Sequence, residues 1–225
     1  MLKKKNAAIV LAGGRGERFG GKTPKQFTML GNKPLFMHCV HTLAACPEIY
    51  GIVIVTGREW LLKTVKLAGI YRAKKLISVV SGGSTRTESA WAGLRALEKD
   101  PPENVLIHDA ARPFLKRKTV SSCINALAKH TSIIPAVPCA ETIIETKNMF
   151  IRKIPDRKNL CAVQTPQAFS YRLIKKIHEL AREKKINATD DAGLVRTLSR
   201  SRVYVIDGDP GNIKITYQQD IKNHS

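Results

Sequence analysis

Apolar runs alternate with segments of helical periodicity along nearly the whole chain. Six runs rich in Val and Ile are almost continuously apolar, which is typical of strands covered on both faces. The expected strands are Ala7–Ala12, Gly51–Thr56, Leu76–Val80, Val105–His108, Ser132–Val137 and Val203–Ile206. The expected helices are Leu35–Ala45, Glu59–Ala68, Arg86–Glu98, Thr119–Ala128, Tyr171–Lys184 and Ala192–Ser199. This alternation predicts an α/β, Rossmann-like fold with a mainly parallel sheet and helices on both faces.

Two of these helices carry start signals. Thr85 and Glu88 have the spacing of a capping box, in which each side chain satisfies a free backbone N–H of the first turn. Thr189 precedes Asp190 and Asp191, and acidic residues are favoured in the first turn of a helix. We therefore expect N-caps at Thr85 and at Thr189.

One segment, Cys139–Phe169, breaks the alternation because it holds no good helix. It has short strand-like runs around Thr142–Glu145 and Phe150–Pro155. These runs predict an extended β-hairpin arm at about residues 139–160, which could not bury itself and would seek a partner subunit. The chain shows no repeat or linker, so we expect a single domain over residues 1–225 with this arm protruding from it.

Length and composition narrow the class of protein. No stretch approaches the roughly 20 apolar residues that cross a bilayer, and no signal-peptide pattern precedes the first strand. We therefore expect a cytoplasmic protein without a membrane partner. The five cysteines are odd in number and lack C-x-x-C spacing, so we expect reduced, mostly buried thiols without a disulfide or zinc site.

The formal net charge of +20 allows two interpretations. One is nucleic-acid binding, and the other is an anionic substrate on a protein with a lysine-rich surface. The basic residues are dispersed, several fall on predicted helices, and no RNA-recognition motif or zinc finger is visible. We favour the second interpretation and predict no nucleic-acid partner.

Ligands of open parallel sheets bind at the carboxyl ends of the strands. The segments that follow the predicted strands are Gly13–Lys25, Gly82–Ser89, Asp109–Pro113 and Gly208–Lys214. The first is rich in glycine and basic residues, with Gly13, Gly14, Gly16, Gly20, Gly21, Arg15, Arg18, Lys22 and Lys25. Glycines let backbone N–H groups close around an anion, and the cations add charge, so this loop predicts phosphate binding.

Three phosphate-binding folds compete for the glycine-rich loop. The dinucleotide pattern G-x-G-x-x-G fails because Phe19 takes the place of the third glycine. A Walker A pattern matches formally over Gly16–Thr23. However, the strand ends several residues earlier, Pro24 pushes Thr23 out of the helical region, and His108 interrupts the apolar run before the acidic partner. A P-loop NTPase therefore remains a distant alternative.

The third fold is that of a nucleotidyltransferase. The G-G-x-G-x-R core and the Pro24-Lys25-Gln26 tail resemble the signature loop of sugar-phosphate nucleotidyltransferases. Asp109 follows a strand and would face this basic loop, which makes it a natural Mg²⁺ ligand, although an Asp capping the next turn would look the same. Arg112 can pair with a local carboxylate instead of touching a ligand.

The segment H-D-A-A-R-P at residues 108–113, with P-K-Q upstream, resembles the 2-C-methyl-D-erythritol 4-phosphate cytidylyltransferases of the non-mevalonate isoprenoid pathway. Further pieces agree with that family in order and spacing. They are Gly82-Gly83 with Arg86 and Ser89, Val137-Pro138 with Glu141-Thr142-Ile143, Gln164 to Phe169, Thr189 to Ala192, and Gly208 to Thr216. The resemblance extends from about Ala7 to Asp220.

The resemblance implies a role for each matching residue. Cytosine and ribose of CTP would be held by Leu11, Ala12, Gly13, Gly14, Arg15, Gly16, Gly83, Ser84 and Ser89, with Arg15 also near the phosphates. Arg18, Lys25 and Lys214 would surround the phosphates as the catalytic residues, and Asp109 would carry Mg²⁺. Thr142 and Arg157 would reach the methylerythritol phosphate from the arm of the other subunit, so the active site would be shared within a homodimer.

The implied reaction is an in-line attack of the acceptor phosphate on the α-phosphorus of CTP, with loss of pyrophosphate. A phosphate dianion is already a nucleophile, so alignment and positive charge are the main requirements. Gly13 stands where many family members have Ala, a variant also found in relatives that use ribitol 5-phosphate. A cytidylyltransferase for another polyol phosphate therefore remains an alternative, although H-D-A-A-R-P favours methylerythritol phosphate. The usual last helix is expected to be short or missing.

Overall fold

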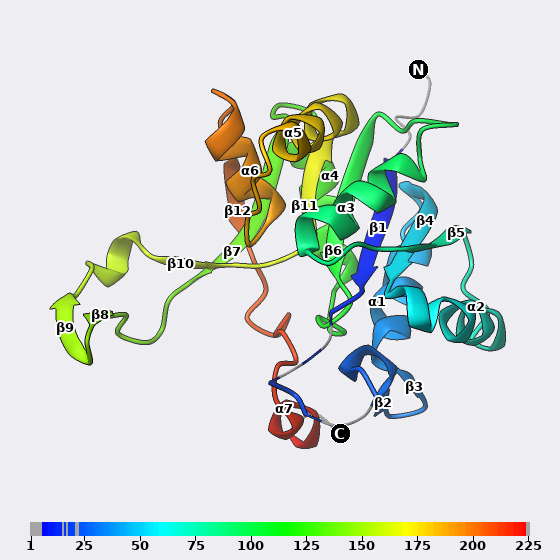
Figure 1. Ribbon diagram of the computed structural model, residues 1–225, viewed down its shortest axis with the longest axis horizontal. Coiled ribbons are helices and arrows are strands. Elements are labelled where there is room, and N and C mark those ends of the chain that lie inside the picture. Colours follow the sequence, from blue (N-terminus) through cyan, green and yellow to red (C-terminus); the bar gives the residue numbers. More distant parts are fainter. Residues whose placement is uncertain (1–5, 15, 17, 21–22, 224–225) are drawn as a thin grey trace.

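A central sheet of eight strands organises the computed structural model, which describes residues 6–14, 16, 18–20 and 23–223. Its strands are β1 (Asn6–Ala12), β4 (Ile49–Thr56), β5 (Leu76–Ser81), β6 (Asn104–Asp109), β7 (Ser132–Pro138), β10 (Cys161–Val163), β11 (Gln167–Ser170) and β12 (Tyr204–Asp207). They follow the order β10-β7-β11-β6-β1-β4-β5, and β12 also pairs with β7 (Figure 1). This order places β1 and β6 near the middle of the sheet.

The pairing is mainly parallel. Strand β1 runs parallel to β4 and β6, β4 to β5, and β7 to β12, whereas β10 and β11 run antiparallel to their neighbours. The predicted mainly parallel sheet is therefore confirmed. The sequence did not predict β10 and β11, because strands of three and four residues are too short to show a period.

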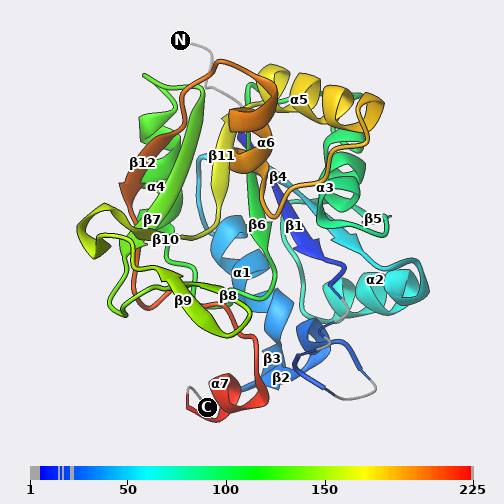
Figure 2. The same ribbon diagram turned by 60° about the vertical axis from the view of Figure 1, so that its left-hand side comes forward.

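Helices cover both faces of the sheet (Figures 1 and 2). The described helices are α1 (Leu35–Ala44), α2 (Leu61–Ile70), α3 (Arg86–Arg95), α4 (Arg117–Ala126), α5 (Tyr171–Glu183), α6 (Asp191–Leu198) and the short α7 (Gln218–Lys222). Ala8 and Val10 of β1 pack in one core with α1, α2 and α4, while Ala7 and Ile9 pack in the other with α3, α5 and α6. Successive side chains of a strand point to opposite faces, so a continuously apolar strand fits this double burial.

The helix starts confirm one predicted cap and correct the other. Thr85 and Glu88 form the expected capping box at the start of α3. At α6 the expected N-cap Thr189 is wrong, because Asp190 takes that place and accepts a hydrogen bond from the Gly193 N–H at 2.8 Å. An N-cap side chain accepts from the N–H two or three residues ahead. For Thr189 these N–H groups, on Asp191 and Ala192, donate to Gln167 Oε1 instead.

The predicted arm is a β-hairpin that projects from the body of the protein (Figure 1). Its strands are β8 (Glu145–Lys147) and β9 (Phe150–Lys153), joined by Asn148 and Met149, which both have positive φ. Such a two-residue turn sets the pairing of Lys147 with Phe150. The expected first strand at Thr142–Glu145 is therefore wrong, since pairing starts only at Glu145.

The glycine-rich loop is not followed directly by an α-helix. Within the described residues, it leads into a single 3-10 turn, Lys25–Phe27, and then into the small hairpin β2 (Met29–Leu30) and β3 (Lys33–Pro34). A P-loop needs a helix whose N-terminus meets the phosphates, so this geometry removes the P-loop alternative.

Three of the five cysteines are buried, in agreement with the prediction of mostly buried thiols. All five cysteines are free; Cys39, Cys46 and Cys123 are buried, Cys139 is partly buried and Cys161 is exposed. Among the described helices, none has both the length and the apolar character to span a membrane.

Candidate active site

A cavity of about 830 Å³ opens at the carboxyl ends of β1, β4, β5 and β6. Residues from the loops after all four strands line it. Those that the sequence analysis predicted are Leu11, Ala12, Gly13, Gly14, Gly16, Arg18, Lys25, Gly83, Ser84, Ser89, Asp109 and Lys214. Arg15 and Lys22 lie outside the described residues. The position of the cavity is the one that an open parallel sheet favours for a ligand.

The glycine-rich loop turns back on itself, so that its basic end faces its start. Gly16 has φ +70°, a conformation that a residue with a Cβ rarely adopts, and its carbonyl accepts a hydrogen bond from the Phe19 N–H at 2.8 Å. The buried Gln26 donates from Nε2 to the Ala12 carbonyl at 2.6 Å. The P-K-Q segment is thereby tied to the end of β1.

A second segment, near the C-terminus, meets this loop. The backbone N–H of the buried Ile215 donates to the Ala111 carbonyl at 2.8 Å, and its side chain packs with Phe19 and Leu35. The Lys25 ammonium donates to the Ile215 carbonyl at 2.7 Å. These contacts carry the neighbouring Lys214 to the edge of the cavity.

Lys25 lies in a cluster of positive charge. Burial, Lys214 and Arg18 together lower the pKa of the Lys25 ammonium from its ordinary value. Like charges held close together repel each other, and an anion between them would remove that repulsion. The cluster is therefore suited to a polyphosphate.

The loop after β5 forms the opposite wall. Ser89 donates from Oγ to the Thr85 carbonyl at 2.9 Å, and a Cβ added at Gly82 would lie only 2.5 Å from that Oγ. The backbone N–H and hydroxyl of Ser84 donate to Glu88 Oε2 at 2.6 and 2.7 Å. These hydrogen bonds lower the pKa of the Glu88 carboxyl. The wall is thus fixed by the cap of α3.

Asp109, the last residue of β6, is held between two cations. Its Oδ1 accepts from Arg86 Nε at 3.3 Å, and its Oδ2 accepts from Lys214 Nζ at 2.8 Å. Burial alone would raise the pKa of the carboxyl, but Arg86 and Lys214 hold it well below its usual range. Asp109 is therefore ionised at neutral pH.

The donor set at Asp109 fits a metal that arrives with phosphate. Within the described part of the chain, no group of three or more His, Cys, Asp or Glu side chains could hold a metal by itself. Mg²⁺ typically takes one or two carboxylates and completes its shell with phosphate oxygens and water. The single ionised carboxylate beside a cationic loop matches that pattern.

His108 and Arg112 support the site from behind. His108 Nε2 lies 3.0 Å from the Arg112 carbonyl, which can only accept, so Nε2 carries the proton and Nδ1 faces the Thr165 hydroxyl at 3.1 Å. Burial lowers the pKa of His108 to about 4. Arg112 donates to the carbonyls of Asn212 at 2.7 Å and Val163 at 3.1 Å. Among the described residues, Arg112 thus pairs with backbone carbonyls and not with a carboxylate, so the alternative left open for it is not what the structure shows.

Thr142 and Arg157 do not reach this cavity in their own chain. Both are exposed on the arm, which the described cavity lining does not include, and Arg157 donates to the Ala140 carbonyl at 3.0 Å. Figure 2 shows the arm hairpin from a second direction. Their expected role in the site of another subunit stays a prediction.

The sequence missed the role of Arg86. Its place in the segment Gly82–Ser89, which follows β5, was a signal, because that segment was expected to face the ligand; in the structure Arg86 is the first residue of α3. Arg86 lines the cavity and pairs with both Asp109 and Asp191, at 3.3 and 2.7 Å. Asp191 lies 105 residues away, and no local pattern indicates that pair.

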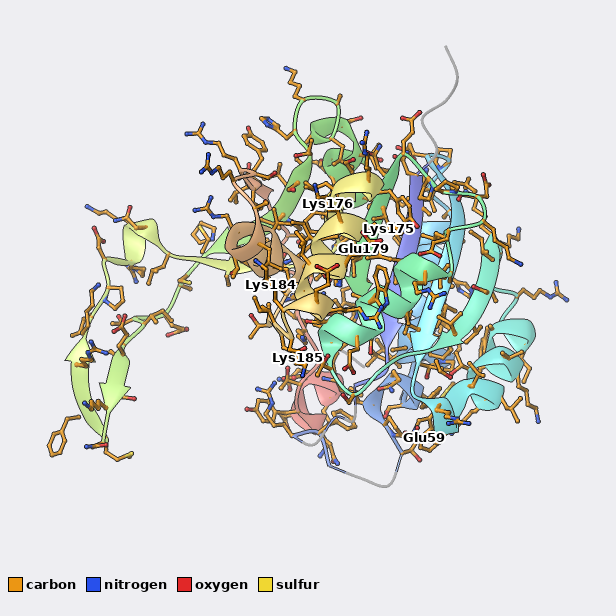
Figure 3. The ribbon with its side chains drawn as sticks, turned by 45° about the horizontal axis from the view of Figure 1, so that its top comes forward. Glu59, Lys175, Lys176, Glu179, Lys184 and Lys185 are labelled. Atoms are coloured by element: carbon orange, nitrogen blue, oxygen red, sulfur yellow. The ribbon has the colours of Figure 1, made fainter. Side chains whose placement is uncertain are left out.

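The positive charge of the protein extends beyond the cavity. Figure 3 labels Lys175, Lys176 and Glu179 on α5 and Lys184 and Lys185 after it. Lys175 lies 3.4 Å from Glu98 and 3.5 Å from Glu179. Part of this charge is therefore paired with acids on a solvated helix face, as the sequence indicated.

The sequence also matches a family of known proteins. The model of the family described as IspD, 2-C-methyl-D-erythritol 4-phosphate cytidylyltransferase, matches residues 6–224. The chain is 39% identical over 219 residues to the 2-C-methyl-D-erythritol 4-phosphate cytidylyltransferase of Shouchella clausii, covering 96% of this chain and 93% of that protein. The protein of the same name from Geobacillus thermodenitrificans is 38% identical over 214 residues, covering 95% and 92%.

Solved structures of similar proteins have the same fold. The crystal structure of 4-diphosphocytidyl-2C-methyl-D-erythritol synthase from Anaerococcus prevotii superposes with a TM-score of 0.86 at 28% identity. That match covers 99% of this chain and 95% of the other. The similarity in fold therefore extends over nearly the whole chain.

Proposed function

Because the chain belongs to the 2-C-methyl-D-erythritol 4-phosphate cytidylyltransferase family, we propose that its cavity binds CTP and performs cytidylyl transfer with the residues described above. The reaction joins the cytidylyl group of CTP to 2-C-methyl-D-erythritol 4-phosphate and releases pyrophosphate. The observation that carries the residue assignment is the gathering of Arg18, Lys25 and Lys214 beside the ionised Asp109 at one cavity.

The nucleoside end of CTP is assigned to the part of the wall formed by the end of β1, the start of the glycine-rich loop and the segment after β5. Backbone groups and small residues line it, and a flat base can approach a backbone without side chains in the way. The residues proposed to hold cytosine and ribose are Leu11, Ala12, Gly13, Gly14, Gly16, Gly83, Ser84 and Ser89. The rigid cap of α3 supports Ser89 and keeps this wall in place before the ligand binds.

The phosphates are assigned to Arg18, Lys25 and Lys214. The acceptor phosphate attacks the α-phosphorus of CTP in line, one P–O bond forms, and the bond to the pyrophosphate oxygen breaks. Negative charge grows on the equatorial and leaving oxygens, and fixed cations stabilise it there. No proton has to leave the nucleophile, because a phosphate monoester is largely dianionic near neutral pH. The neutral, buried His108 therefore has no part as a base.

Magnesium is proposed to be held by Asp109 together with phosphate oxygens of CTP. When bound, Mg²⁺ would neutralise charge on the phosphates and on the departing pyrophosphate. Lys214 now occupies Asp109 Oδ2, and its ammonium, on a side chain that is 42% exposed, can turn to a phosphate instead. Asp109 and Lys214 would thus exchange their mutual contact for contacts with the ligand.

The arm is proposed to complete the site of a second subunit in a homodimer. It carries exposed apolar side chains, among them Met149 at 96% and Phe150 at 78% exposure, which water does not stabilise. Thr142 and Arg157 on this arm would contact the methylerythritol phosphate of the partner site.

A single domain over residues 1–225 and a cytoplasmic location also stay predictions.

Pyrophosphate release tests the function directly. The protein is supplied with CTP and Mg²⁺, and with 2-C-methyl-D-erythritol 4-phosphate or ribitol 5-phosphate in parallel reactions. Release with the first acceptor only is the expected result, and it would also exclude the polyol-phosphate alternative. Preference for ribitol phosphate, or release without any acceptor, would contradict the proposed function.

A further inference from the structure

Arg86 connects the cavity to a buried ion pair that the reaction itself does not require. Its guanidinium donates from Nε to Asp109 Oδ1 at 3.3 Å and from Nη1 to Asp191 Oδ2 at 2.7 Å. Among the described residues, no group accepts a hydrogen bond from its buried Nη2. One guanidinium thus bridges a carboxylate of the site and a carboxylate of the core.

Asp191 is anchored from several directions. Its side chain is fully buried, and its Oδ1 accepts from His178 Nε2 at 2.9 Å. The backbone N–H groups of Asp191 and Ala192 both donate to Oε1 of the buried Gln167, at 3.1 and 3.0 Å. Asp191 is therefore fixed to α5 through His178 and to the sheet strand β11 through Gln167.

This anchoring determines how Arg86 meets Asp109. An arginine left to itself prefers a two-pronged contact with one carboxylate, which would occupy both oxygens. The side-on form of that contact uses Nε together with Nη2, which lies on the same side of the guanidinium. Here Asp191 holds Nη1 on the other side, Nη2 makes no described hydrogen bond, and Nε alone reaches Asp109. Oδ2 of Asp109 stays with Lys214, at the cavity side.

We propose that Arg86 is a positioning residue for Asp109, and that Asp191, backed by His178, holds Arg86 in the orientation that leaves one Asp109 oxygen for the ligand. The role rests on the proposed function, because it concerns the carboxylate assigned to Mg²⁺. Groups that orient a metal ligand from behind control metal affinity without touching the metal.

The variant Asp191→Asn tests this role. It keeps the shape of the side chain but removes the charge that holds Nη1, so the guanidinium is free to turn and bring both Nε and Nη2 to Asp109. The matched control is Asp190→Asn, which loses the same charge at the same helix end. Asp190 contacts Gln167 and the Gly193 N–H and makes no described contact with Arg86.

The readout is binding of Mn²⁺, as a substitute for Mg²⁺, followed by electron paramagnetic resonance in the presence of CTP. Asp191→Asn is expected to weaken Mn²⁺ binding by about 10- to 100-fold, on the scale found for groups behind metal ligands. Binding of CTP without metal should equal that of the parent, and Asp190→Asn should bind Mn²⁺ like the parent. If Asp191→Asn does not fold, Arg86→Lys replaces it, because a single ammonium cannot span both carboxylates and the same weakening is expected.

Parent-like Mn²⁺ binding by Asp191→Asn, or by Arg86→Lys in its place, would overturn the positioning role. Equal weakening in Asp190→Asn, or loss of metal-free CTP binding, would also overturn it and indicate general loosening of α6. The measurement needs no acceptor, so an inactive parent that still binds Mn²⁺ and CTP would contradict only the proposed function. A parent that binds no metal with CTP would overturn both.

Discussion

The ammonium of Lys25 donates a hydrogen bond to the backbone carbonyl of Ile215, with 2.7 Å between Nζ and the oxygen. The two residues are 190 positions apart, and Lys214 precedes the acceptor. This contact brings cations from both ends of the chain to one cavity. A charged phosphate oxygen is a stronger acceptor than a neutral carbonyl, so Lys25 can move to the ligand with little rearrangement.

Loss of the Lys25 ammonium is expected to reduce turnover more than CTP affinity. In Lys25→Ala, kcat should fall by about 10²- to 10³-fold, the scale for a lost donor that stabilises transition-state charge. Steady-state pyrophosphate release gives kcat and KM for CTP separately. The control is Lys66→Ala, an exposed lysine on α2 outside the described cavity lining. A raised KM with unchanged kcat would show that Lys25 serves binding alone.

Two glycines that line the cavity, Gly13 and Gly82, should respond differently to the same substitution. A Cβ at Gly13 would lie 3.7 Å from its nearest neighbours, an ordinary contact, so Gly13→Ala should retain activity. A Cβ at Gly82 would lie 2.5 Å from Ser89 Oγ, so Gly82→Ala must displace Ser89 and should weaken CTP binding. Calorimetric titration with CTP compares the two, and equal affinities would remove Ser89 from the nucleoside site.

Buried His108 should make the protein less stable under mildly acidic conditions. Its pKa is about 4 when folded and 6.5 ordinarily, so the unfolded chain binds the extra proton first. The associated stability is complete above the unfolded pKa and declines as pH falls toward the folded one. The loss between about pH 7.5 and about pH 5 is about 2 kcal/mol. Asp109 and Asp191, whose folded pKa values are lowered, lose their contribution only below the ordinary Asp range.

Urea unfolding of the parent and of His108→Gln, each at about pH 7.5 and about pH 5, isolates this contribution. The glutamine cannot take up a proton and keeps a donor toward the Arg112 carbonyl. The parent should lose more unfolding free energy on acidification than the variant does. An equal loss in both proteins would mean that folding does not lower the pKa of His108.

The proposed sharing of the active site between two subunits predicts complementation between two inactive variants. Lys25→Ala damages the body of a subunit and Arg157→Ala damages its arm, so a mixed dimer would contain one intact site. After unfolding and refolding together in equal amounts, activity should return to about a quarter of the parent value for random pairing in a two-fold dimer. Each variant refolded alone is the control. Activity no greater than the average of the two controls would place Arg157 and Lys25 in the same subunit's site, or Arg157 in none.

The long elements were predictable because their patterns are local. An apolar strand such as β1, or a capping box such as Thr85 with Glu88, can be recognised from a few consecutive residues. The loops that face the ligand could be predicted once the strands were located, since the carboxyl ends of parallel strands meet at one edge of the sheet. Lys25, Asp109 and Lys214 were thus expected where the cavity lies.

The unpredicted parts depend on contacts between distant segments. Asp191 was expected only as an acid in the first turn of a helix, yet its side chain pairs with Arg86 and His178 inside the core. Strand β11 runs antiparallel between β6 and β7, and its short length hides any period. Nothing in a window of neighbouring residues encodes either relation.

The two ends of the arm are strands of the main sheet. The chain leaves β7 at Pro138 and returns on β10, where Cys161 pairs with Pro138 and Val163 with Ala136. Both stems of the hairpin are therefore hydrogen-bonded to each other before a partner arrives. An arm held by paired strands at both of its ends loses less conformational entropy on docking than a free loop of the same length. Affinity between subunits would then depend on few contacts at the tip, and Arg157 would swing through a narrow range of positions.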